Sequence, residues 1–178
     1  MASMPLAIDW TRTALALPES VREELKSRLE RLRPFFPEMK SRMKIGITRS
    51  FDGLAFQSES GFVKLMVEVR RTRKGAWKYP TYWTLAHELM HLAQFNAHGI
   101  PSGERACDIH ALARLPPEFI DESPSYLVVP RGRRSRWLPR DAKMAHELAV
   151  EALELRRKGL RRYASWWEAE FETRANGK

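Results

Sequence analysis

The chain has 178 residues, 43% of them hydrophobic, which is enough for one domain with a genuine core, with or without an appendage. Its formal charge of +9 favours anionic partners, and no apolar run approaches the roughly 18 residues that a membrane-spanning helix needs. The single cysteine excludes an intramolecular disulfide, and residues 1–10 do not resemble a secretory signal. We therefore expect a cytoplasmic protein.

The first predicted element is a helix between Glu19 and Arg33, which Pro34 ends. Its apolar residues recur at helical spacing: Val21, Leu25, Leu29 and Leu32.

Three strands are expected next. In residues 43–48 and 62–70 two sets of side chains alternate, one of them apolar throughout, as in half-buried strands. The pair Asp52-Gly53 signals a turn, and residues 54–58 follow it as another candidate strand.

Residues 87–91 read His-Glu-Leu-Met-His and carry most of the functional information. No Pro or Gly interrupts residues 82–97, and Pro80 suits a first helical turn. Residues four apart lie on one face of a helix, so His87 and His91 would present two imidazoles to one zinc ion. Glu88 lies about 100° around the helix and can reach a metal-bound water without binding the metal. The leucines at 85, 89 and 92 form an apolar stripe on the side away from the histidines.

A third zinc ligand is expected from a second helix, for which Ser102 is a candidate N-cap. Glu104 follows His91 by thirteen residues and shares a face of that helix with Asp108. Glu104 is the candidate third ligand, and Asp108 would accept the second ring N–H of a ligand histidine.

Other residues compete for the third position. His98 would lie about 10 Å beyond His91 along the helix that carries the histidine motif. His110 falls on the face of the second helix opposite Glu104. Cys107 lies beside Glu104, but a lone cysteine of this kind is usually a packing residue.

The pair of motifs, His-Glu-Leu-Met-His and Glu104-Arg-Ala-Cys-Asp108, resembles the zincin metallopeptidases of the gluzincin type. The resemblance covers residues 81–113, and the short linker is similar to that of the minimal, single-domain members. It implies zinc bound by His87, His91 and Glu104, general acid–base catalysis by Glu88, and support from Asp108. It also implies an α+β core in which a helix backs a small mixed sheet of about three strands, followed by the active-site helix and the glutamate helix. The donor that stabilises the oxyanion is open among Tyr126, Arg105, His98 and His110.

Basic residues gather in two segments. The first contains Arg70, Arg71, Arg73, Lys74 and Lys78, with Trp77 and Tyr79 interleaved. Between residues 131 and 162, eleven basic side chains stand against four acidic ones, and this segment includes Arg133, Arg134 and Arg136. Both segments are candidates for contact with nucleic acid, although a solvated charged face is the commoner explanation.

We expect three parts: a metallopeptidase core over residues 1–116, a Pro-containing loop over or beside the cleft at 117–139, and a C-terminal helical appendage packed on the core at 140–178. The predicted function is zinc-dependent hydrolysis of peptide bonds in a peptide or protein substrate. The alternatives are a nucleic-acid-binding or regulatory protein with a structural or inactive zinc site, and a nucleic-acid-associated protease.

Overall fold

The computed structural model describes residues 6–50, 52–58, 63–96 and 99–177, and the chain has an α+β fold. It divides into two compact units, Met1–Ala97 and His98–Lys178. The predicted boundaries at residues 116 and 139 stay predictions.

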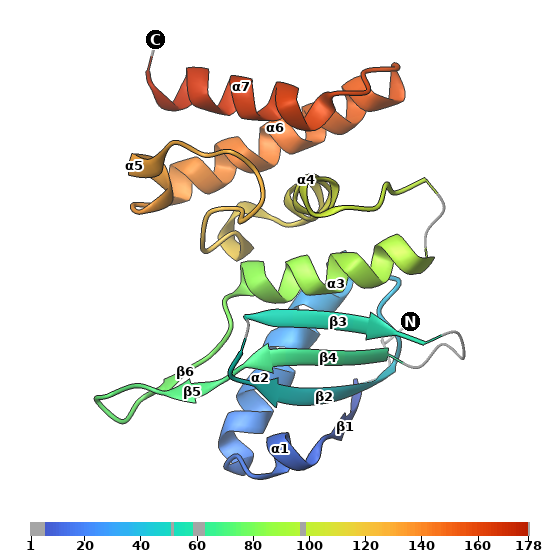
Figure 1. The fold of residues 1–178 in the computed structure, drawn as a ribbon, viewed down its shortest axis with the longest axis vertical. Helices are drawn as coiled ribbons and strands as arrows, with labels where there is room; N and C mark the ends of the chain where they lie inside the picture. Colours follow the sequence, from blue (N-terminus) through green and yellow to red (C-terminus); the bar gives the residue numbers. More distant parts are fainter. Residues whose placement is uncertain (1–5, 51, 59–62, 97–98, 178) are drawn as a thin grey trace. The chain divides into compact units, whose positions relative to one another are not determined.

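The first unit contains a four-stranded mixed sheet of order β1-β2-β4-β3 (Figure 1). Its strands are β1 (Ala7–Trp10), β2 (Arg42–Thr48), β3 (Gly53–Gln57) and β4 (Val63–Glu68). The strands β1, β2 and β4 run parallel, whereas β3 is an antiparallel edge strand that pairs with β4. The carboxyl ends of the three parallel strands therefore meet at one edge of the sheet.

The sequence predicted β2, β3 and β4 but missed β1. That strand has only four residues, and its side chains are exposed or half-buried. Its pairing with β2 is reinforced by Asp9, whose carboxylate accepts two hydrogen bonds from Arg42, at 2.8 and 3.1 Å. A short edge strand joined to a distant partner in this way leaves no periodic signal in the sequence.

The helices of the first unit are α1 (Arg12–Leu15), α2 (Glu19–Leu32) and α3 (Tyr82–Asn96), with a 3-10 turn at Arg33–Phe35. The predicted apolar face of α2 is confirmed, because all four of its named residues are buried. A small second hairpin joins β5 (Arg70–Arg71) to β6 (Trp77–Lys78) and was not predicted.

The helix α2 holds the start of α3 through arginine contacts. Arg28 donates to the carbonyl of Pro80 at 3.3 Å, and its guanidinium lies 5.2 Å from the ring centroid of Tyr82. Arg31 donates to the hydroxyl of Tyr82 at 2.6 Å. These contacts fix the position from which the histidine motif begins, and α3 then packs along the edge strand β3 (Figure 1).

The second unit is helical. Its elements are α4 (Glu104–Arg114), a 3-10 turn (Pro117–Phe119), α5 (Arg131–Arg134), α6 (Pro139–Arg157) and α7 (Tyr163–Ala175). Its core includes an aromatic pair: Trp167 and Phe171 are fully buried, and their rings stack at a centroid distance of 4.9 Å. The indole of Trp167 also donates to the carbonyl of Ala145 in α6 at 3.1 Å, so α6 and α7 share one core.

Candidate metal centre

The helix that carries the histidine motif begins at Tyr82, two residues after Pro80. Thr81 caps it, because its hydroxyl accepts a hydrogen bond from the backbone N–H of Thr84 at 2.9 Å. Pro80 therefore precedes the helix and does not belong to its first turn, which corrects the prediction. The predicted leucine stripe is confirmed as core, since Leu85, Leu89 and Leu92 are at most 1% exposed.

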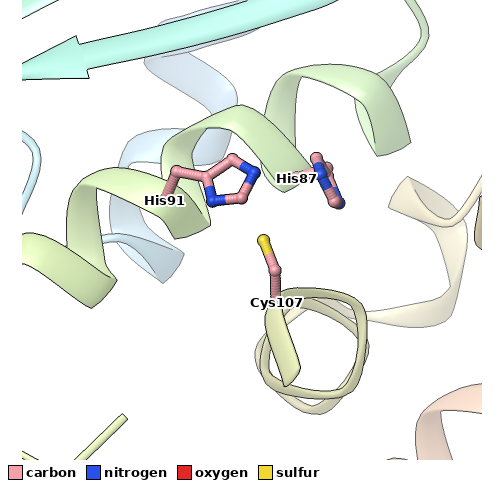
Figure 2. Close-up of side chains that lie close together, drawn as sticks. All are labelled: His87, His91 and Cys107. Carbon is pink, nitrogen blue, oxygen red and sulfur yellow. The ribbon is translucent and has the colours of Figure 1, made fainter. Parts of the chain in front are cut away.

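His87 and His91 lie together on α3, as their spacing predicted. Their ring centroids are 4.8 Å apart and the ring planes are nearly perpendicular, at 89° (Figure 2). His87 is buried and His91 is half-buried. The sequence rule that residues four apart share a helical face is sufficient to explain this arrangement.

Gln94 orients His91, and the sequence analysis did not identify it. The Nδ1 atom of His91 lies 2.9 Å from the side-chain oxygen of Gln94, one turn further along α3. Since an amide oxygen only accepts, Nδ1 carries the proton in this arrangement. Nε2 then keeps its lone pair for a metal, and the i, i+3 spacing was the signal that could have revealed the contact.

Glu88 is buried against the start of β3. Its side chain is so close to Gly53 that a Cβ atom at position 53 would lie 2.6 Å from Cγ and 2.8 Å from Oε1 of Glu88. Any other residue at 53 would have to displace the glutamate. The Asp52-Gly53 turn therefore does more than reverse the chain, because its glycine makes room for the proposed general base.

The helix α4 carries the other predicted site residues, in the second unit. Its N-cap is Gly103 at φ 105°, and no side-chain cap is present, so the expected cap at Ser102 is wrong. A positive φ is strained for a residue with a side chain, which explains why glycine occupies this position. Glu104 is exposed, whereas Cys107, which projects from α4 in Figure 2, is fully buried.

Asp108 is also fully buried and holds the chain that follows α4. Its Oδ2 atom accepts hydrogen bonds from the backbone N–H groups of Tyr126 at 2.8 Å and Leu127 at 3.2 Å. Tyr126 itself is half exposed. Asp108 therefore has a structural role in the second unit, and its predicted support of a ligand histidine stays a prediction.

Two other histidines, His98 and His110, were candidates for the third ligand. His98 lies outside the described residues. His110 is 9% exposed, and its Nε2 atom is one of the buried side-chain atoms of the described residues that lack a hydrogen-bond partner. Burial, with the charges of Arg156 and Arg114, lowers the pKa of His110 to about 4, so it is neutral at pH 7.

The two basic segments differ in how far their side chains are engaged in contacts within the fold. In the second unit, Arg133 donates to the carbonyl of Ala175 and lies 3.5 Å from Asp141, while Arg134 donates to the carbonyl of Leu127 at 2.8 Å. Arg136 is exposed. Guanidinium groups that hold a fold together are less available to phosphate. Arg70, Arg71, Arg73 and Lys74 are all exposed on the β5–β6 hairpin.

Comparisons with known proteins give no relative for this chain. No family model, no curated protein and no solved structure matches it. Among the described helices, none combines the length and the apolar character needed to cross a bilayer.

The residues of α3 fit a zinc ion in their chemistry. Imidazole nitrogen is a usual zinc ligand, and the contact with Gln94 leaves the Nε2 atom of His91 available. Two imidazoles on adjacent turns with a buried carboxylate beside them form a partial site that needs at least one further protein ligand.

Proposed function

We propose that this protein is a zinc-dependent peptidase, a minimal metallopeptidase that resembles the gluzincins. The observation that carries the proposal is the convergence of the His87 and His91 rings on one side of α3, with the carboxylate of Glu88 buried against Gly53. A structural zinc site needs the two histidines but has no use for Glu88.

In this proposal His87 and His91 supply two ligands, and α4 supplies the third. The resemblance implies Glu104. Cys107, three residues further along, lies on the same side of the helix and is the alternative, because thiolate sulfur is also a common zinc ligand. When bound, zinc supplies Lewis acidity that makes water nucleophilic at neutral pH.

Glu88 is the general base and general acid of the proposed reaction. Its carboxylate takes a proton from the attacking water and returns it to the amine that leaves. The close contact with the backbone at Gly53 limits the positions that this carboxylate can adopt. Tyr126 is the candidate donor to the oxyanion, because the residue is half exposed and its backbone N–H is held by Asp108.

The edge strand β3 is the proposed place for an extended substrate. Among the described strands it pairs only with β4, and its first residue is Gly53, which lies against Glu88. Leu54 and Phe56, two residues apart on one face of β3, are 51% and 53% exposed. A peptide that pairs with the strand through its backbone would find apolar side chains beside it. This makes a peptide bond the preferred target.

The test is the Glu88→Gln variant, which keeps the shape of the side chain but removes the base. We expect the purified protein to bind one zinc ion per chain, and the variant to keep this zinc while losing cleavage of a labelled protein such as casein. Cleavage at the wild-type rate by Glu88→Gln would refute the mechanism. Retained zinc in a wild-type protein that cleaves nothing would favour the alternative, a regulatory protein with a structural or inactive site.

A further inference from the structure

The first unit contains a hollow whose lining includes no residue of the histidine motif. It has a volume of about 790 Å³ and is lined by residues that follow the three parallel strands. Thr13 follows β1, Arg49 follows β2, and residues 69–71 follow β4. None of its lining residues belongs to α3. The carboxyl edge of parallel strands is a common place for a ligand, because the chain leaves the sheet there and the following loops diverge.

The lining of this hollow is strongly basic. Arg49, Arg70 and Arg71 are all exposed, and no carboxylate is among the lining residues. Arg70 is exposed and lies 3.5 Å from the half-buried carboxylate of Glu68, a long ion pair that a better-placed anion can replace. Residues 69–79 carry five basic side chains and no acidic one. The charge of the hollow therefore fits an anion.

The hollow also has an aromatic and apolar wall. Trp77 is half-buried and stands opposite Arg71 in the β5–β6 hairpin, with the guanidinium 5.7 Å from the indole centroid. Ile47 and Val69 line the same space. A free phosphate ion would use the arginines only. A ligand that uses both parts of the wall has a negative charge and a flat ring, as a nucleotide does.

We propose that this hollow binds single-stranded nucleic acid, with backbone phosphates on Arg49, Arg70 and Arg71 and a base stacked on Trp77. Unpaired bases can turn outward and enter a hollow, whereas the bases of a duplex are stacked inside the helix. Arg73 and Lys74 lie at the tip of the same hairpin and extend the positive surface along which the strand continues. The site does not depend on zinc or on Glu88.

The test uses a fluorescently labelled oligothymidylate and the Glu88→Gln protein, with binding followed by anisotropy at several salt concentrations. Replacing Arg49, Arg70 and Arg71 together by glutamine should weaken binding by more than tenfold and lower the slope of log K against log salt by about 2. Trp77→Leu should weaken binding without changing that slope, because it removes stacking and no charge.

The matched control replaces Arg157, Arg161 and Arg162, three exposed arginines of the second unit, by glutamine, which changes the net charge equally. We expect it to alter the affinity by less than about twofold. Equal losses in the two triple variants would overturn the proposal, since binding would then follow total charge. It would also be overturned if a duplex of the same length or a polyglutamate peptide bound more tightly than the single strand. Circular dichroism confirms that each variant is folded.

Discussion

The Cγ atom of Glu88 lies where a side chain at position 53 would begin, 2.6 Å from the Cβ atom that Gly53 lacks. This relationship joins the active-site helix to the edge strand, although the two residues are 35 positions apart. The glutamate cannot retreat towards β3, and the strand cannot carry a larger residue there without moving it.

We therefore expect Gly53→Ala to reduce peptide cleavage while leaving the histidine ligands in place. Displacing a catalytic group by about 1 Å can cost on the order of 100-fold in rate. The measurement is the rate of casein cleavage, with zinc content determined on the same samples. Gly132→Ala is the matched control, because nothing lies within 4 Å of a Cβ at that position. A Gly53→Ala enzyme as fast as the control would show that the position of Glu88 tolerates the methyl group.

The hydrogen bond from His91 to Gln94 gives a second prediction. Gln94→Ala frees the His91 ring to rotate and to change tautomer, so zinc should bind about 10–100-fold more weakly. Competition with a chromophoric chelator measures the affinity. Gln57→Ala is the control: it also removes amide hydrogen bonds to α3, here the two with Asn96, which lies five residues beyond His91. If both variants bound zinc as the wild type does, Gln94 would have no part in orienting the ligand.

The sequence predicted those parts of the fold that periodic burial specifies. The helix α2 and the strand β4 each bury one regular face, and their residues followed the expected pattern. The strand β2 follows it in part: Met43 and Ile45 are buried, whereas Ile47 is half-buried and Gly46 is buried. The strand β1 escaped prediction because it is short and pairs with β2, a partner distant in the sequence. The β5–β6 hairpin escaped because each of its strands has only two residues, too few for a periodic pattern.

In the candidate site too, local sequence spacing predicts some contacts, whereas others depend on tertiary packing. The pairing of His87 with His91 follows from helical spacing alone, and so was predictable. The contact of Glu88 with Gly53 depends on how α3 packs on β3, which no local pattern encodes. The burial of Asp108 was missed for a similar reason, because its partners are backbone N–H groups 18 and 19 residues further along the chain.

The identity of the third ligand can be decided between Glu104 and Cys107 with cobalt in place of zinc. Our proposal expects Glu104→Gln to weaken metal binding severely and Cys107→Ser to leave it nearly unchanged. A thiolate bound to Co²⁺ gives an intense charge-transfer absorption in the near ultraviolet, which a carboxylate does not. Such a band in the wild type, lost in Cys107→Ser, would transfer the ligand role from the glutamate to the cysteine.

The buried neutral His110 should make the protein less stable in acid. Its pKa is lowered from 6.5 to about 4 by burial and by Arg156 and Arg114, so as the pH falls the unfolded chain takes up the proton first. The contribution to stability is fully present above pH 6.5 and is lost between about pH 6.5 and 4, by at most about 3 kcal/mol. We expect His110→Gln to lose less of its free energy of unfolding than the wild type between pH 7.5 and 4.5, as urea titrations would measure. Parallel losses in the two proteins would mean that other groups account for the acid sensitivity.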